Sequence, residues 1–193
     1  MLNNRMELVV PSFARLPAYA EALKRGFWSD NLRREQSRNE ELARIAADPA
    51  AFVASLDDRE ARGGPITLSD GTQVKRLPGF RRWMWDETSE GGFCGNIGFR
   101  WLPGTPDLPP HCLGHIGYAV VPWKQRRGYA TRALGLMLAE ARKEGLPFVE
   151  LTTDPDNQPS QKVITSNGGV FVERFTAVAG HGGKEELRWR IVL

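Results

Sequence analysis

The stretch Gly114–Leu138, GHIGYAVVPWKQRRGYATRALGLML, combines a short apolar run, a basic loop and a helical pattern. Residues 115–121 are rich in β-branched and aromatic side chains, as strands are, and Pro122 ends the run because proline cannot donate to a sheet ladder. From Ala130 to Ala141, apolar residues recur three and four positions apart, which indicates one buried face of a helix. The stretch therefore predicts a strand, a tight loop and a helix.

The loop of this stretch, Gln125–Ala130, meets the expected helix at Gly128. At a helix N-terminus several backbone N–H groups lack an intrahelical partner, and the helix dipole is positive. A glycine there lets the backbone approach whatever lies in front of it, while Lys124, Arg126 and Arg127 add positive charge. We therefore predict an anion site, suited to a phosphate or pyrophosphate.

The composition is typical of a soluble globular protein, with 41% hydrophobic and 25% charged residues among 193. A net charge of +3 suits a phosphate-bearing ligand but is too small to indicate a nucleic-acid partner. Two cysteines do not make a disulfide framework, and no apolar run has the length of a membrane span or a secretory signal. We expect a soluble, cytoplasmic protein of one domain with no membrane partner.

The remainder of the chain alternates strand and helix patterns around this stretch. The expected strands are 6–10, 66–68, 81–86, 93–102, 148–153, 170–175 and 187–193. The expected helices are 17–27, a second helix capped by Ser29 or Asp30 that runs to 46, 50–56, and a short one capped by Asp156 or Asn157 that runs to 167. This order predicts a mixed α/β sheet in which a helical crossover places 148–153 beside 116–121.

Two motifs resemble the GNAT N-acetyltransferase superfamily. The loop 125–130, Q-x-x-G-x-A after a GYAVV strand, resembles the acetyl-CoA loop of that family. The segment Asn157–Gly168 is similar to its N-x-x-S-x-x-V-I-x-x-x-G motif, at the expected distance downstream. The resemblance is clearest over 81–193 and is closest to a poorly characterised bacterial subgroup.

The resemblance implies a fold and an activity. The fold would be a GNAT-like central mixed, mostly antiparallel sheet with flanking helices and a splayed parallel strand pair, Ile116–Val121 and Phe148–Thr153. Residues 1–193 would form a single domain, with 1–80 on the acceptor side and 81–193 as the acetyl-CoA-binding core. The implied activity is direct transfer of an acetyl group from acetyl-CoA to a primary amine in a ternary complex.

The resemblance also implies which residues hold acetyl-CoA. Pantetheine would pair with backbone freed on the splayed strand, which would supply the oxyanion donor as well. The pyrophosphate would take N–H bonds from the loop and the first helical turn, and relatives use the motif asparagine to contact the cofactor. The implied cofactor-binding residues are Ala119, Val120, Val121, Gln125, Arg126, Arg127, Gly128, Tyr129, Ala130, Thr131, Asn157 and Ser160.

His115 is the predicted catalytic base. Several relatives carry a glutamate just before the strand, where it handles the amine proton, and a neutral imidazole can accept a proton near pH 7. The alternative is a histidine that only hydrogen-bonds a neighbour. The usual proton donor, a tyrosine in the second motif, is replaced by Ile164, so water, Ser160 or the departing amine proton would protonate the sulfur. Thr152 stands where some protein N-terminal acetylases carry a carboxylate.

Other chemistries have weaker support in the sequence. His111, Cys112, His115 and Cys94 do not have a strong zinc spacing, so no metal is predicted. The chain has neither a P-loop nor a G-x-S-x-G elbow, which disfavours a P-loop enzyme and an α/β-hydrolase. A generic phosphate-binding domain for a nucleotide stays open as a third alternative.

The acceptor is a small-molecule or peptide amine that the sequence does not identify. It is expected to be selected by residues 12–79 and by the AGHGG loop at 179–183. Arg81 and Arg82 are expected to be solvated. A non-catalytic acyl-CoA-binding or regulatory module competes with the enzyme, and Ile164 favours that alternative slightly. A homodimer also stays open.

Overall fold

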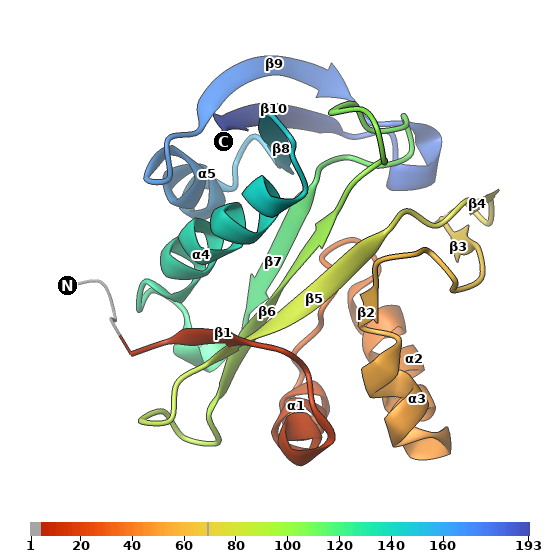
Figure 1. The fold of residues 1–193 in the computed structure, drawn as a ribbon, viewed down its shortest axis with the longest axis vertical. Helices are drawn as coiled ribbons and strands as arrows, with labels where there is room; N and C mark the ends of the chain where they lie inside the picture. Colours follow the sequence, from red (N-terminus) through yellow and green to blue (C-terminus); the bar gives the residue numbers. More distant parts are fainter. Residues whose placement is uncertain (1–4, 69) are drawn as a thin grey trace.

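Two antiparallel sheets form the centre of the structure (Figure 1). The computed structural model describes residues 5–68 and 70–193. The first sheet has the order β1 (Glu7–Val9), β5 (Gly79–Trp85), β6 (Phe93–Arg100) and β7 (Ile116–Val120), with β2 (Asp57–Asp58) also paired to β5. The second has the order β8 (Phe148–Thr153), β10 (Glu185–Val192) and β9 (Val170–Thr176), and a separate hairpin joins β3 (Ile66–Thr67) to β4 (Gln73–Val74).

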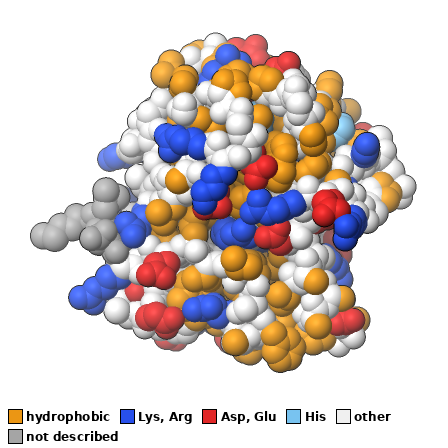
Figure 2. All heavy atoms as spheres, viewed as in Figure 1, with side chains coloured by type: hydrophobic (Ala, Val, Ile, Leu, Met, Phe, Trp, Pro, Cys, Tyr) orange, Lys and Arg blue, Asp and Glu red, His pale blue; other side chains and the backbone are white. Residues whose placement is uncertain are grey.

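The helices gather at opposite sides of the first sheet (Figure 1). The α-helices are α1 (Leu16–Lys24), α2 (Arg34–Ala47), α3 (Pro49–Ala54), α4 (Tyr129–Lys143) and α5 (Gln158–Thr165). Three short 3-10 helices are η1 (Phe13–Arg15), η2 (Pro122–Lys124) and η3 (Ala179–His181). Among the described helices, none has the length and apolar character needed to cross a bilayer. On the face seen in Figure 2, basic and acidic side chains are intermixed.

Two apolar cores hold these layers together. One lies beneath α4 and contains the helix face predicted from the sequence, including Ala133, Leu134 and Met137, packed on the sheets. The other lies beneath α1, where Tyr19 stacks on Trp83 with ring centroids 5.0 Å apart. Burying such aromatic and aliphatic side chains is the main free-energy gain of folding. The cores place α4 on one face of the first sheet and α1 on the other.

The second helix begins later than the sequence predicts. The expected cap, Asp30, accepts hydrogen bonds at Oδ1 from the backbone N–H groups of Leu32 (2.8 Å) and Arg33 (3.0 Å). This arrangement holds residues 30–33 in a turn, so α2 starts at Arg34. The chain between α1 and α2 is thereby left as a loop, and this loop borders the cleft described below.

The strands expected to form one mixed sheet, with 116–121 and 148–153 as a splayed parallel pair, lie in two separate sheets. Within residues 5–68 and 70–193, no strand ladder links β7 to β8, and each strand ladder found is antiparallel. One backbone hydrogen bond joins the two strands, from His115 N to Glu150 O at 2.7 Å. The Glu150 N–H is taken by the His115 ring nitrogen Nδ1 at 2.9 Å, and not by a strand neighbour. The His115 ring therefore takes the N–H group that a β7–β8 ladder would need at its first position, and no ladder forms.

Candidate active site

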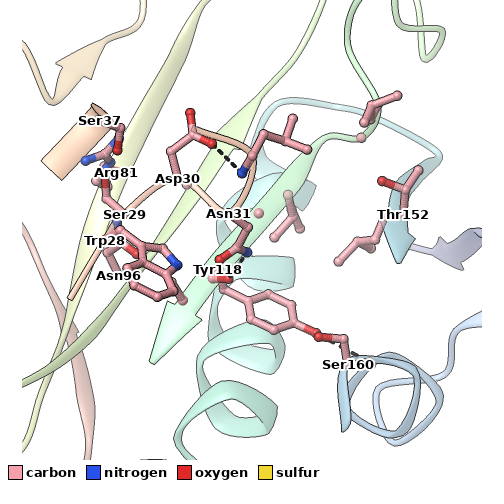
Figure 3. Close-up of a pocket in the computed structure, with 18 of the residues that line it drawn as sticks. Trp28, Ser29, Asp30, Asn31, Ser37, Arg81, Asn96, Tyr118, Thr152 and Ser160 are labelled. Carbon is pink, nitrogen blue, oxygen red and sulfur yellow. Dashed lines mark hydrogen bonds between the residues drawn. The ribbon is translucent and has the colours of Figure 1, made fainter. Parts of the chain in front are cut away.

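A cleft opens where the two sheets separate (Figure 3). Its walls come from β7, the start of α4, β8, α5 and the loop between α1 and α2. In the close-up, Trp28, Ser29, Asp30 and Asn31 lie on the side of the α1–α2 loop, and Thr152 lies on the opposite side. Segments that are far apart in the sequence thus meet at one opening, as binding sites commonly require.

One edge of β7 is fully occupied by β6. Val121 N donates to Cys94 O at 3.0 Å, and His115 O accepts from Arg100 N at 2.9 Å. Because backbone groups alternate between the two edges of a strand, Ala119 also directs its N–H and C=O toward β6. The backbone predicted to be free at Ala119 and Val121 is therefore used by the sheet, and Val121 does not line the cleft.

The other edge of β7 faces the cleft. Tyr118 O accepts from Asn31 Nδ2 at 3.3 Å, and Val120 O accepts from Gln125 Nε2 at 3.4 Å. By the same alternation, the N–H groups of Tyr118 and Val120 point to this edge as well. Of the three strand residues predicted to pair with a cofactor, Val120 has the suitable orientation, and Tyr118 joins it.

β8 supplies the opposite edge. Glu150 directs its backbone to His115, so Thr152, two residues further on, directs its backbone to the same edge. Thr152 lines the cleft. The opening is therefore closed at the His115–Glu150 pair and widens toward Val120, which leaves a slot with hydrogen-bonding backbone on both sides.

The basic loop closes the wide end of the slot. Gly128 is the N-cap of α4 and has a φ of +81°, a left-handed conformation that favours glycine. Arg126 also has a positive φ, +62°. The cleft lining includes Gln125, Arg126, Gly128, Tyr129, Ala130 and Thr131. The helix N-terminus therefore faces the cleft, as the sequence predicts for an anion site.

Three side chains of the loop region point elsewhere. Lys124 is buried, and its Nζ donates to Glu90 O at 2.5 Å and Phe93 O at 2.7 Å. Arg127 lies outside the cleft lining and donates to Trp123 O at 3.5 Å. The Tyr129 hydroxyl donates to Asp86 Oδ2 at 2.8 Å, so only its backbone is left for a ligand. Arg126 is exposed and lines the cleft, so it is the loop cation placed to meet a ligand.

The second motif begins α5 at the cleft. Asn157 Oδ1 accepts from Ser160 N at 3.2 Å, which confirms the predicted cap, and both residues line the cleft. Ile164 is 1% exposed and belongs to the apolar core. The Tyr118 hydroxyl, which sequence reasoning missed, reaches from β7 to donate to Ser160 O at 3.4 Å (Figure 3). Burial raises the pKa of Tyr118 to about 12.

His115 is fully buried and does not line the cleft. Its Nδ1 accepts the Glu150 N–H, so the neutral imidazole carries its proton on Nε2. Burial lowers the pKa of His115 to about 4, although the nearby Glu150 carboxylate opposes this effect. The geometry therefore favours the alternative role, a histidine that bonds its neighbour and closes the narrow end of the slot.

A buried ion pair borders the cleft beside the α1–α2 loop. Arg81 Nη1 donates to Glu41 Oε1 at 2.8 Å, and Ser29 Oγ donates to the same oxygen at 2.8 Å. The Tyr19 hydroxyl donates to the other oxygen of Glu41. The expectation that Arg81 is solvated was wrong, because α2 brings a carboxylate from a distant part of the chain onto β5.

Glu186 is the second residue that sequence reasoning missed. It lies on β10, is 6% exposed and lines the cleft. Burial and, second to it, the negative charge of Asp154 raise the pKa of Glu186 to about 7. The sequence carries no local signal for this, since the burial results from packing of the second sheet. In the part of the chain that the structure describes, no three His, Cys, Asp or Glu side chains are grouped to hold a metal ion.

A family model for an acetyltransferase (GNAT) domain matches residues 31–170. No curated protein matches the sequence closely enough to count as a relative. This match covers most of the cleft, from the α1–α2 loop to the start of β9.

Solved structures share the fold at low sequence identity. An acetyltransferase (GNAT family) from Bacillus anthracis is 20% identical, with 98% of this chain and 95% of that chain covered and a TM-score of 0.58. A Salmonella typhimurium acetyl transferase that modifies the N-terminal serine of ribosomal protein L7/L12 is 14% identical, with 100% and 98% covered and a TM-score of 0.62. The microcin C7 self-immunity acetyltransferase MccE, solved with acetyl-CoA and AMP, is 13% identical, with 100% and 94% covered and a TM-score of 0.61.

Proposed function

Since the chain belongs to the GNAT acetyltransferase family, we propose that it transfers an acetyl group from acetyl-CoA to a primary amine by direct attack in a ternary complex. The observation that carries this proposal is the slot between β7 and β8, into which Tyr118 and Val120 direct their backbone N–H groups. A linear ligand with amide groups can add to such an edge as an extra strand.

In this proposal the two ends of acetyl-CoA occupy different parts of the cleft. The pyrophosphate lies at the N-terminus of α4, where Gly128 and Ala130 offer backbone N–H groups and Arg126 offers charge. Pantetheine runs along β7 toward the narrow end, so that β7 and β8 act as a splayed parallel pair. Asn157 and Ser160 flank it from α5.

The proposed chemistry requires the amine to be held next to the thioester and a backbone N–H to be directed at the carbonyl oxygen. The amine nitrogen attacks the thioester carbonyl carbon, an N–C bond forms, and the C–S bond breaks to release the CoA thiolate. A backbone N–H of Tyr118 or Val120 stabilises the oxyanion that develops on the carbonyl oxygen. The acceptor approaches from the α1–α2 loop, over Gly98 and Gly117, where an added Cβ would meet no atom closer than 3.4 Å.

The competing function is a module that binds acyl-CoA without turnover. Ile164 favours it slightly, because this isoleucine stands where many relatives carry the tyrosine that protonates the thiolate. The Tyr118 hydroxyl, which reaches α5 from the opposite wall, favours the enzyme. The acceptor is proposed to be a small-molecule or peptide amine; the peptide option is supported by a structurally similar acetyl transferase that modifies the N-terminal serine of ribosomal protein L7/L12.

Thiol release from acetyl-CoA separates these functions. We expect steady release in the presence of a panel of primary amines (amino acids, polyamines, aminoglycosides and short peptides), with an acetylated amine detected by mass spectrometry. Tight CoA binding without turnover across the panel would support the module. Displacement of CoA by ATP at equal concentration would instead indicate a nucleotide domain and would contradict both.

A further inference from the structure

We propose that Glu186 is the catalytic base that removes a proton from the acceptor ammonium, an assignment that rests on the proposed acetyltransferase function. The carboxylate lies on β10, in the wall of the cleft, and is nearly enclosed by the protein. His115, the base expected from the sequence, lies outside the cleft lining. The amine proton therefore needs another acceptor.

The strand register places Glu186 beside the slot. In the ladder of β8 and β10, Arg188 is opposite Thr152 and Leu187 is opposite Thr153, so Glu186 lies diagonally next to Thr152. Such diagonal neighbours on one sheet face are about 7–8 Å apart, a distance over which long side chains still interact. Thr152 directs its backbone into the slot and lies at the cleft in Figure 3. Glu186 is thus the diagonal neighbour of a residue, Thr152, whose backbone faces the slot.

Glu186 also lies on the face from which an acceptor would arrive. Side chains alternate along β8, and Leu151 belongs to the core beneath α4, so Thr152 lies on the opposite face. Glu186 shares that face because it is a diagonal neighbour of Thr152 in the ladder. The same face of the first sheet is covered by α1 and borders the α1–α2 loop. The carboxylate and the acceptor entrance are therefore on the same side.

Among the carboxylates that line the cleft in the described residues, Glu186 is buried and has no partner, whereas Asp154, which also has none, is exposed. Glu41 is bonded to Arg81, Asp30 accepts from two backbone N–H groups, and Asp58 accepts from the N–H groups that follow it. Within residues 5–68 and 70–193, the Glu186 carboxylate has no hydrogen bond or ion pair, while it is only 6% exposed. A buried carboxylate without a partner is a group that a ligand cation can satisfy.

The surroundings of Glu186, burial first and charge second, keep its basicity high. Burial and the Asp154 carboxylate raise its pKa to about 7, and Lys184 opposes them. On neighbouring elements, the His181 ring is bonded to His111 O, and Arg188 is paired with Glu150 and Glu173. General bases work best when their pKa is close to the working pH. Glu186 is therefore ionised in a useful fraction at neutral pH and is a stronger base than an ordinary carboxylate.

The proton transfer balances without a further reactant. One N–H proton of the ammonium passes to a carboxylate oxygen of Glu186, directly or through one water, and the freed lone pair attacks the thioester carbonyl carbon. As the C–S bond breaks, a second N–H proton neutralises the thiolate. Glu186 then returns its proton to solvent through the cleft. The products are the acetylated amine, CoA thiol and one released proton.

Glu186→Gln tests the assignment through the pH profile of kcat/KM for thiol release, with acetyl-CoA and the primary-amine panel as probes. We expect a loss of about 10²–10³-fold near pH 7.5, disappearance of the acidic limb centred near pH 7, and unchanged CoA affinity. Glu185→Gln is the matched control, because the neighbouring Glu185 is exposed and paired with Arg174, and it should leave the profile unchanged. Asp154→Asn removes the like charge and should move the acidic limb to lower pH.

Each outcome decides a different point. Wild-type turnover that survives Glu186→Gln with its acidic limb intact overturns the assignment and leaves the proposed function standing. If Glu186→Gln does not fold, as judged by circular dichroism, Asp154→Asn decides, and an unmoved acidic limb overturns the assignment. Wild-type protein that releases no thiol with any amine contradicts the proposed function, and the assignment falls with it.

Discussion

Replacing His115 by asparagine separates the two roles that an imidazole can have at this position. The Oδ1 of asparagine can accept the Glu150 N–H that the ring Nδ1 accepts now at 2.9 Å, but asparagine cannot take up a proton. A structural His115 is thus largely replaceable by asparagine, whereas a catalytic one is not. His115→Ala removes the acceptor as well and leaves a cavity in a fully buried site.

The magnitude follows from the pKa of His115, which burial lowers from 6.5 to about 4. Between these values the unfolded chain binds a proton that the folded chain does not, so the free energy of unfolding falls as the pH falls from 6.5 toward 4. The difference amounts to about 3 kcal/mol for His115. His115→Asn lacks this contribution, so it should lose about 3 kcal/mol less stability than the wild type on acidification from pH 7 to pH 4.

Urea unfolding followed by tryptophan fluorescence at pH 7, 5.5 and 4 measures this difference. At pH 7, His115→Ala should lose about 2–4 kcal/mol, because the buried Glu150 N–H is left without a partner and a cavity forms. An equal pH dependence of stability in the wild type and His115→Asn would refute the reasoning. Loss of the acidic limb of kcat/KM in His115→Asn would instead assign the base to His115.

Three further substitutions test other parts of the cleft. Gly128→Val places a β-branched side chain at a φ of +81°, so we expect a stability loss of about 1–2 kcal/mol by thermal unfolding and loss of CoA binding by calorimetry; unchanged affinity would remove the loop from the site. Lys124→Met leaves the carbonyls of Glu90 and Phe93 without the buried ammonium group. We expect about 1–3 kcal/mol of destabilisation per carbonyl in urea unfolding. An unchanged free energy of unfolding would show that water replaces these contacts. Glu186→Gln should be as stable as the wild type at pH 4 and up to about 3 kcal/mol more stable at pH 8. The reason is the raised pKa of Glu186, because the wild type loses folding stability as the pH rises through about 7. Equal stability of the two proteins at pH 8 would mean that the carboxylate is well solvated.

The sequence predicts the local elements of the cleft because each depends on neighbouring residues. The apolar spacing of α4, the glycine that begins it and the asparagine that caps α5 are all set within one or two helical turns. The same holds for β7, whose apolar run ends at Pro122. These elements lie where the motifs predict them, and they carry the resemblance to the family.

The features that sequence reasoning missed depend on contacts between distant segments. Whether Ala119 or Val120 directs its backbone to the cleft is decided by the register with β6, which no local pattern specifies. The division of the sheet depends on the His115 ring, which takes the Glu150 N–H across 35 positions of sequence. The burial of Glu186 likewise depends on the pairing of β10 with β8, and the pairing of Arg81 with Glu41 joins two distant elements.

Amide hydrogen exchange, measured by NMR with and without CoA, tests the central claim that the slot between β7 and β8 holds the cofactor. We predict that the Tyr118 and Val120 amides, which face the slot, exchange more slowly when CoA is added. The Ala119 amide, already bonded to β6, should show little change and serves as the internal reference. Tight CoA binding with no added protection at Tyr118 and Val120 would contradict the account.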